Sequence, residues 1–536
     1  MQAEWILMGG PVLSGHTGWR SVEAVAVAGG KVIAFGTRGD VMAACGPGTQ
    51  VIDLHGRAVI PGLIDAHLHI LGYAMTLDTL AVAGLPSLEA VRKAVADQVV
   101  CKAEGEWIVG RGWDQDRWLE RREPNRHDLD RVAPGNPVYL QRNCNHLAVV
   151  NTAALRLAGI TRETPDPPGG QIDRDPETGE PTGMLRENAQ ALIQRIVPEM
   201  GHERRRTLLR LAMREALSYG ITGVHTDDVD RAAGGFEQAD DLFRSAIADA
   251  PIRVTQMIPG DWAGAAAERG IVTGAGDEWY RYGQVKMFAD GSLGGRTAAL
   301  LEPYSDDPST RGIYIHGREA FIESVSRIHA LGDQVGCHCI GDGAATLFVD
   351  AVEEAQRRAP RPDARHRMIH AQILNRDLMH RMRQAGIVAD IQPVFMKSDG
   401  YWFAERVGVE RARTSYAWKS LYDLGVNLCG GSDCPIEPLN IWYGIHCAVN
   451  RQDLNGYPAG GWNPAERLSV AEALHLYTTG ASYATFQEGV KGTLAPGMAA
   501  DLVVLDRNPF ACDPAELKEI KVDMTMVGGR ITYQIA

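Results

Sequence analysis

Short apolar segments recur eight times through the central part of the chain, and helical stretches such as Ala344–Arg358 and Arg204–Ser218 lie between some of them. Alternation of strands and helices predicts parallel strands. Eight parallel strands predict an α/β fold of the (β/α)8, TIM-like barrel class, in which catalytic groups lie at the carboxyl ends of the strands. The predicted strands are Val59–His69, Ile221–His225, Ile252–Ile258, Gln284–Ala289, Gln334–Ile340, Arg367–Ile373, Ile387–Gln392 and Val426–Gly430.

The two ends of the chain differ from the middle, because both consist of short strands separated by turns. Gly29-Gly30 and Gly528-Gly529 each separate two apolar runs, which is typical of hairpins. Two separate small β appendages would explain this pattern. We favour one β-sandwich domain built from residues 1–60 and 490–536, which would flank a barrel of residues 61–489.

The interval between the first and second predicted barrel strands is too long for one helix. We therefore expect residues 71–215 to hold an insertion within the barrel. Its apolar runs, and a hairpin predicted near Glu177–Gly183, indicate a small α/β subdomain beside the active-site face.

The composition excludes several classes of function. The 54 basic and 67 acidic residues give a net charge of −13, and an acidic chain without a basic run is poorly suited to nucleic acids or anionic membranes. Nine cysteines, an odd number, do not form a disulfide framework, so we expect reduced thiols in the cytoplasm. We find no signal peptide and no apolar run of about 18 residues that could span a bilayer.

The strongest local motif ends the first predicted barrel strand. Side chains alternate along a strand, so His67 and His69 project to the same face. Two imidazoles so placed can share one metal ion. A lone pair of this kind is more often structural, but here it lies where this fold keeps its chemistry.

Lys286 lies inside the apolar run Val285–Ala289, where a buried ammonium is unfavourable unless it is neutralised or paired. Burial favours the neutral amine, which can take up CO₂ and become an anionic carbamate ligand. The alternative is an ordinary lysine that reaches the strand end or pairs with Asp290.

Further candidate ligands end later strands. His338, His370 and Asp433 close the fifth, sixth and eighth predicted strands. Strand alternation turns Cys337 and Cys339 away from His338, so these cysteines are expected to be buried and apolar rather than ligands. Agreement of so many ligand-type residues at strand ends indicates a metal centre.

These residues also carry a resemblance to a known family. The segments Val59–His69 and Gly492–Leu502 are typical of the amidohydrolase superfamily, and the resemblance covers nearly the whole chain. The segments Phe288–Ala298, His338–Ala344 and Gly431–Pro435 resemble its amidohydrolase family 3, the YtcJ-like metal-dependent hydrolases, a group similar to N-substituted formamide deformylase.

The resemblance implies a set of ligands. His67, His69 and Asp433 would hold one metal, His338 and His370 a second, and carboxylated Lys286 would bridge both. Two Zn²⁺ ions per chain are implied, although other divalent metals or a single-metal site would also suit the residues. The ions would share a nucleophilic hydroxide, and Asp433 would carry its proton to the leaving amine.

The same resemblance narrows the reaction. Ring deaminases of the superfamily usually carry a glutamate three residues after the fifth-strand histidine and lack the fourth-strand lysine. Here Gly341 stands three residues after His338, and Lys286 is present. This favours hydrolysis of an amide-like C–N bond of a small N-formyl, N-acyl or cyclic amide. A mononuclear deaminase, or an ester or carbamate hydrolase, is the alternative.

Substrate recognition is less constrained. Trp113, Asn145 and His146 of the insertion are candidate substrate-binding residues, and Arg296 could bind a carboxylate or an oxyanion. Trp113 could equally pack the insertion, and Arg296 could equally tie its own loop. A homodimer is suggested by the superfamily alone. A catalytically silent relative that serves as a binding protein would normally lose ligands, and all the expected ligand types are present.

Overall fold

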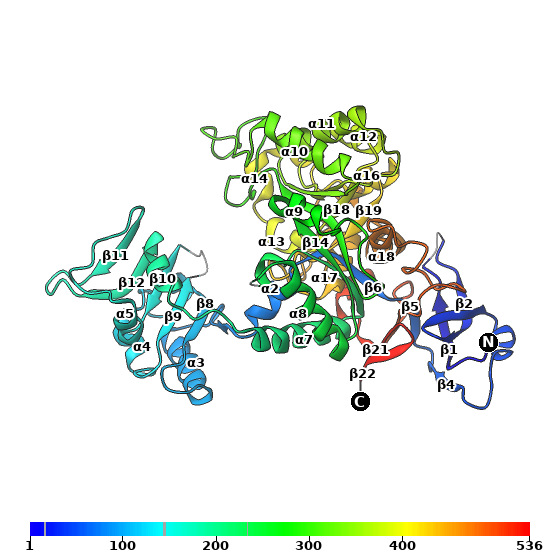
Figure 1. Ribbon diagram of the computed structural model, residues 1–536, viewed down its shortest axis with the longest axis horizontal. Coiled ribbons are helices and arrows are strands. Elements are labelled where there is room, and N and C mark those ends of the chain that lie inside the picture. Colours follow the sequence, from blue (N-terminus) through cyan, green and yellow to red (C-terminus); the bar gives the residue numbers. More distant parts are fainter. Residues whose placement is uncertain (16–17, 143–145, 233, 536) are drawn as a thin grey trace. The chain divides into compact units, whose positions relative to one another are not determined.

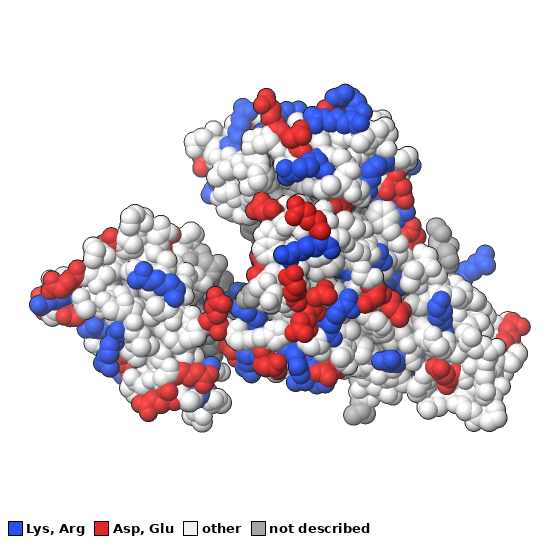
Figure 2. All heavy atoms as spheres, in the orientation of Figure 1, with Lys and Arg blue, Asp and Glu red and all other residues white. Residues whose placement is uncertain are grey.

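The computed structural model describes residues 1–535 except 16–17, 143–145 and 233 (Figure 1). The chain forms two compact units, of which one comprises residues 1–73 and 209–536 and the other residues 74–208. None of the helices in the described part of the chain combines the length and the apolar character that a membrane span requires. Acidic and basic side chains are intermingled on the face that Figure 2 shows.

The larger unit contains a sheet of eight parallel strands in sequence order, which is nearly closed into a barrel. Its strands confirm the eight predicted positions. Beyond the last strand, Asp433 N donates to His67 O at 2.7 Å, so the chain after the eighth strand lies beside the first. The strands are β6 (Leu63–Leu68), β13 (Ile221–Thr226), β14 (Arg253–Pro259), β15 (Tyr280–Phe288), β16 (Val335–Cys339), β17 (Arg367–His370), β18 (Val388–Ile391) and β19 (Leu428–Gly430).

Helices connect successive barrel strands. In α11 (Asp342–Arg358), for example, apolar residues at helical spacing such as Phe348, Val352 and Ala355 are buried. The other longer helices of this unit are α7 (His202–Ser218), which begins in the smaller unit, α8 (Phe236–Asp249), α10 (Arg318–Ala330), α12 (Arg376–Gln384) and α17 (Ile441–Asn450).

The predicted first strand is two strands in the structure. Residues Ala58–Pro61 form β5, which pairs with a C-terminal strand, and β6 starts at Leu63. The change of sheet falls at Gly62, whose N–H donates to Asp501 O at 2.8 Å. A Cβ at Gly62 would lie 2.3 Å from Thr222 Oγ1, so only glycine fits this close approach.

Strands from both chain ends share one mixed sheet, in the order β22-β21-β20-β5-β1-β2-β3, with β4 paired to β1. Antiparallel pairing of β5 with β20 joins the two ends. Both predicted Gly-Gly hairpins are present, and all four glycines have positive φ. The two-layer sandwich arrangement stays a prediction. The strands are β1 (Trp5–Leu13), β2 (Ser21–Ala28), β3 (Lys31–Gly36), β4 (Gln50–Asp53), β20 (Leu502–Leu505), β21 (Val522–Val527) and β22 (Arg530–Gln534).

A buried ion pair connects the barrel to this terminal sheet. Arg253 at the start of β14 donates to Asp501 through Nε at 2.7 Å and Nη2 at 3.1 Å. Both side chains are 4% exposed. Asp501 Oδ1 also accepts from Gly528 N at 2.8 Å. The aspartate of the Gly492–Leu502 motif therefore has a structural role at this junction.

Replacing Asp501 by alanine is expected to lower the free energy of unfolding by about 3–5 kcal/mol, because the buried Arg253 guanidinium then keeps only a 3.4 Å contact with the exposed carboxylate of Glu278 as an ion pair among the described residues. Denaturant unfolding of the purified chain measures the change. The matched control is Asp523→Ala, which removes a more exposed ion pair with Arg57 at 3.3 Å and should cost less than about 1 kcal/mol. Equal effects of the two variants would contradict the assignment.

The smaller unit is built on a six-stranded mixed sheet in the order β11-β12-β10-β9-β8-β7. Alternate residues of β9 enter different apolar clusters, since Val138 and Leu140 pack with α3 whereas Tyr139 packs with α5. Both faces of the sheet are thus covered. The elements are β7 (Leu80–Ala81), α3 (Leu88–Cys101), β8 (Ile108–Trp113), α4 (Arg126–Asp130), β9 (Val138–Arg142), β10 (Leu147–Val150), α5 (Thr152–Ala158), β11 (Gly170–Arg174) and β12 (Pro181–Glu187).

Candidate metal centre

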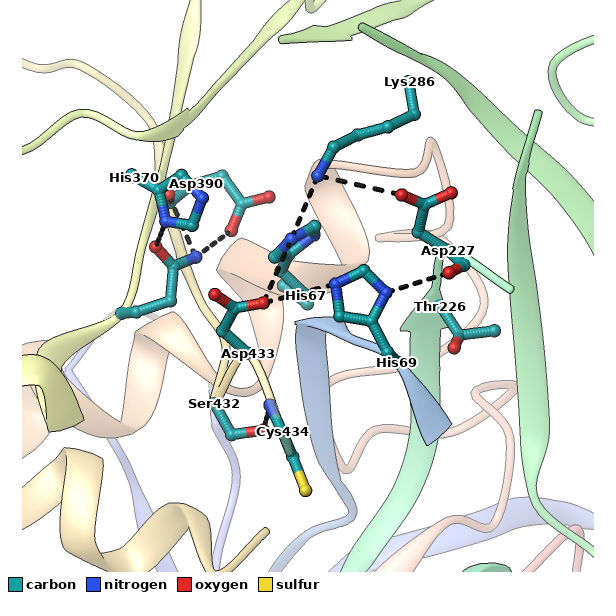
Figure 3. Close-up of polar contacts among 12 residues, drawn as sticks. His67, His69, Thr226, Asp227, Lys286, His370, Asp390, Ser432, Asp433 and Cys434 are labelled. Atoms are coloured by element: carbon teal, nitrogen blue, oxygen red, sulfur yellow. Dashed lines mark hydrogen bonds and ion pairs between the residues drawn. The ribbon is translucent and has the colours of Figure 1, made fainter. Parts of the chain in front are cut away.

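Side chains from distant strand ends converge at the carboxyl end of the barrel (Figure 3). One ligand atom each from His67, His370 and Asp433 lie within 4.8 Å of one another, and all three residues are buried. Asp433 Oδ1 lies 3.6 Å from His67 Nε2 and 3.5 Å from His69 Nε2. The His-X-His pair and Asp433 therefore share one place, as strand alternation and closure of the barrel predict.

Lys286 reaches the same cluster from β15. Its Nζ lies 3.2 Å from His67 Nε2 and 3.9 Å from Asp227 Oδ2, and its side chain is 2% exposed. The pairing with Asp290, which the sequence left open, is not made, because the Asp290 carboxylate accepts from three backbone N–H groups instead.

Hydrogen bonds fix which nitrogen of His370 and of His69 faces the cluster. His370 Nδ1 lies 2.8 Å from Gln392 Oε1, and His69 Nδ1 lies 2.9 Å from Asp227 O. Both oxygens can only accept, so each Nδ1 carries the proton and each Nε2 keeps its lone pair. Histidine ligands are commonly oriented in this way by an acceptor on the far nitrogen.

His338 uses the opposite nitrogen. Its Nε2 donates to Gly291 O at 2.9 Å, which leaves Nδ1 as the free ligand atom. Its ring centroid lies 4.5 Å from that of His370. The structure thus brings His338 beside the cluster, although it is not one of the three residues whose ligand atoms lie closest together.

The environment controls protonation of the histidines. Burial, together with the positive charge of Lys286, lowers the pKa of His67 well below its usual value and that of His338 to about 4. Burial and the neighbouring His338 likewise lower the pKa of His370. Burial opposes protonation of His69 as well, but the neighbouring Asp433 carboxylate raises the pKa of His69 above its usual value. The lowered pKa values keep His67, His338 and His370 neutral at pH 7, which is the form that binds metal ions.

The residues present fit a divalent cation. Asp433 Oδ1 and His67 Nδ1 are buried and have no hydrogen-bond partner among the described residues. A buried acceptor without a partner is unfavourable, and a cation beside Asp433 would satisfy it. Imidazole nitrogens with a carboxylate oxygen form a donor set that suits zinc and related ions.

Backbone geometry also sets this site apart. Asp433 and His370 both have positive φ, at 57° and 76°, a region that non-glycine residues rarely occupy. Such conformations persist where surrounding structure holds them, and they are frequent at functional sites. Gly431 supports the arrangement, because a Cβ there would lie 2.6 Å from His67 N and 2.7 Å from His67 O.

Replacing Gly431 by alanine is expected to push the segment that follows β19 away from His67 and to lower activity about 10²-fold, the effect of a displacement of roughly 1 Å at a catalytic site. Metal content and kcat/KM measure the change. Gly489→Ala is the matched control, because no atom lies within 4 Å of its added Cβ. A fully active Gly431→Ala enzyme would show that this contact does not position the cluster.

The cluster lies in a cavity of about 410 Å³. Its wall contains the predicted ligands together with aromatic and aliphatic side chains and a few polar groups. The lining residues beyond the ligands are Phe288, Ser292, Leu293, Gly294, Ile340, Gln372, Phe395, Ser398, Asp399, Trp402 and Ile436.

The structure describes three of the four predicted substrate-binding residues. Trp113 has no exposed surface, and its Nε1 donates to Leu140 O at 2.8 Å, so it packs the core of the smaller unit. His146 of the same unit is exposed and lies 2.9 Å from Glu187. Arg296 does not line the cavity and pairs with Asp306 at 2.8 Å, which is the loop-tying alternative. Asn145 lies outside the described residues.

Four residues that contact the ligands or line the cavity were not predicted from the sequence. Gln392 orients His370, and Asp227 contacts both His69 and Lys286. Gln372 and Asp399 line the cavity. Gln392 ends a predicted strand and Asp227 closely follows another, so their positions alone could have identified them as candidate site residues. Asp399 lies on a short helix, and nothing in its sequence position indicated a role in the site.

Comparison with known proteins agrees with this geometry. The sequence profile of the amidohydrolase family matches residues 50–533. The chain belongs to the amidohydrolase family. This confirms the predicted family and makes the protein a hydrolase, as the motifs indicated.

Relatives of the chain match along nearly its whole length. YtcJ of Bacillus subtilis (strain 168), which carries an amidohydrolase name, is 36% identical over 91% of this chain and 91% of its own length. An N-substituted formamide deformylase of Arthrobacter pascens is 30% identical over 96% of this chain and 95% of its own. The crystal structure of an uncharacterised metal-dependent hydrolase from Pyrococcus furiosus is 31% identical, with a TM-score of 0.78 over 94% of this chain and 99% of that one.

Proposed function

We propose that this protein is a metal-dependent amidohydrolase that cleaves an amide-like C–N bond of a small N-formyl, N-acyl or cyclic amide. The observation that carries the proposal is the convergence of His67, His370 and Asp433 within 4.8 Å, at the end of a parallel barrel and in a cavity of small-molecule size. The named activity of the Arthrobacter pascens relative supports C–N hydrolysis.

The ligand assignment is the one that the family resemblance implies. His67, His69 and Asp433 would hold one Zn²⁺, and His338 and His370 a second, with other divalent ions also suited to these donors. Carboxylated Lys286 would bridge the two. When bound, the ions would polarise the substrate carbonyl and acidify a water molecule.

The protein's own groups supply the remaining steps. Asp433 Oδ1, which lies within 3.6 Å of both His67 and His69, would accept the proton of the attacking water and return it to the leaving amine. Gln392 and the Asp227 carbonyl hold two imidazoles in the required tautomer. The apolar walls of the cavity would limit access of bulk water to the reacting carbonyl.

We also propose a domain organisation, a cellular location and an oligomeric state for this enzyme. The 61–489 barrel, which contains the 71–215 insertion, would be the catalytic part, and residues 1–60 and 490–536 would form a β-sandwich. We place the enzyme in the cytoplasm and propose that it forms a homodimer. It would bind a small-molecule substrate and neither nucleic acid nor membrane.

Metal analysis combined with a substrate screen tests the proposal. We expect about two equivalents of zinc or another divalent ion per chain, and amine release from at least one N-formyl, N-acetyl or cyclic amide. One equivalent of metal per chain, with ammonia release from an aromatic ring, would favour the mononuclear deaminase. Cleavage of esters or carbamates alone would favour the ester or carbamate hydrolase. A chain that binds no metal would contradict all of these.

A further inference from the structure

We propose that the cavity holds a second recognition element, formed by Asp399 and Gln372, which binds a cationic N–H donor group of the substrate. This inference rests on the proposed function, because it names the substrate class of the same cavity. Both residues line the cavity that contains the ligand cluster, and neither is one of the ligands.

Asp399 presents one carboxylate oxygen that is only weakly occupied. Tyr416 Oη donates to its Oδ2 at 2.5 Å, and Gln372 Nε2 approaches the same oxygen at 3.4 Å. Its Oδ1 has a contact with Ser398 Oγ, at 3.4 Å. Burial raises the pKa of Asp399 to about 6, which leaves it mainly ionised at pH 7. The carboxylate is therefore held in place by Oδ2 and can accept a donor through Oδ1.

Gln372 contributes a second acceptor. Its side chain amide nitrogen faces Asp399, which fixes the amide orientation, since the reverse would place two oxygens together. Its Oε1 is buried without a hydrogen-bond partner among the described residues, and the residue is 3% exposed. A buried acceptor without a donor is unfavourable unless a ligand supplies one.

The charged groups nearby leave a negative balance at this element. Lys397, the adjacent lysine, directs its ammonium to Glu437 at 2.9 Å. Glu437 is buried and its charge acts to raise the pKa of Asp399, so it adds to the negative potential. A ligand with a positive charge would be attracted to Asp399, and an anionic end would be repelled.

The walls of the cavity specify the rest of the ligand. Phe395 stacks on the ring of His370, with centroids 5.9 Å apart and planes 14° from parallel. Trp402 and Leu293 extend the apolar wall. The substrate class is therefore an amide with an aromatic or apolar body that ends in a protonated amine or amidine, whose N–H groups pair with Asp399 and Gln372.

Binding of benzamidine tests this element without turnover. Acetophenone is the matched probe, because it has the same ring and a similar shape but no N–H donor and no charge. Calorimetry on the metal-loaded full chain should give at least about tenfold tighter binding of benzamidine than of acetophenone. The preference should fall to twofold or less in Asp399→Asn and should weaken in Gln372→Met.

Controls separate recognition from folding. Acetophenone affinity and metal content should be unchanged in both variants, which shows that the cavity is intact. Asp306→Asn, which alters an aspartate tied by Arg296 outside the cavity wall, should keep the full preference. Equal binding of the two probes by the unaltered chain, or full preference in Asp399→Asn, would overturn the inference.

The binding test of this element and the test of the proposed reaction can fail separately. A chain that prefers benzamidine but hydrolyses no amide would retain this element and lose the proposed function. A chain that hydrolyses amides without any preference for the cationic probe would keep the function and lose the element.

Discussion

Replacement of Lys286 by alanine is expected to lower amide hydrolysis by about 10²–10³-fold or more, the loss that follows removal of one preorganised charge-stabilising group. The Lys286 side chain is 2% exposed, and its Nζ lies 3.2 Å from His67 Nε2, inside the ligand cluster. If its carbamate bridges the metal ions, the variant should also lose bound metal. Both kcat/KM and metal content therefore fall together.

Chemical rescue distinguishes a bridging ligand from a structural lysine. A short-chain carboxylic acid with bicarbonate can occupy the space of the missing side chain and supply the bridging oxygens, so part of the activity of Lys286→Ala should return. The matched control is Lys491→Ala, because Lys491 is also a buried lysine, 3% exposed, but does not line the cavity. This control should keep its metal, and no added acid should alter its rate. Normal rate and metal content in Lys286→Ala would refute the bridging role.

Most barrel strands could be predicted, because the sequence pattern that specifies each strand is local. Each strand is a short apolar run, and its position follows from residues within that run. The first strand is the exception, since Val59–His69 reads as one segment but β5 ends at Pro61. The strand is divided because β5 pairs with β20, whose residues lie more than 400 positions further along the chain. A pairing over that distance cannot be predicted from the local sequence pattern.

In the candidate site, too, the residues that could be predicted are those whose position follows from the local sequence. Ligand-type residues that end strands could be predicted, because barrel closure brings strand ends together whatever the intervening loops do. The roles of Trp113 and Arg296 depend on how the insertion and a loop fold, which the local sequence does not determine. In the structure Trp113 is buried, and Arg296 pairs with Asp306. Asp399 and Gln372 could not be predicted, because their role depends on one weakly paired and one unpaired acceptor atom, which only side-chain contacts reveal.

Replacement of Asp433 by asparagine is expected to leave metal bound but to lower kcat by about 10²–10⁴-fold, the range that general acid–base catalysis contributes. Asparagine has nearly the same shape and retains one coordinating oxygen, so the contacts with His67 and His69 can persist. Its amide cannot accept a proton from the attacking water at neutral pH and return it to the leaving amine. The defect should therefore appear in kcat, with KM and metal content close to those of the unaltered enzyme.

Substrates with different leaving groups make this test specific. An amide whose amine leaves without protonation should lose less rate in Asp433→Asn than one with a strongly basic amine, because only the second needs the returned proton. Asp342→Asn is the matched control, since Asp342 is 7% exposed, close to the 6% of Asp433, but accepts from Leu301 N and does not line the cavity. It should turn over normally. Near-normal kcat in Asp433→Asn would remove this carboxylate from proton transfer, whereas joint loss of metal and rate would assign it to coordination alone.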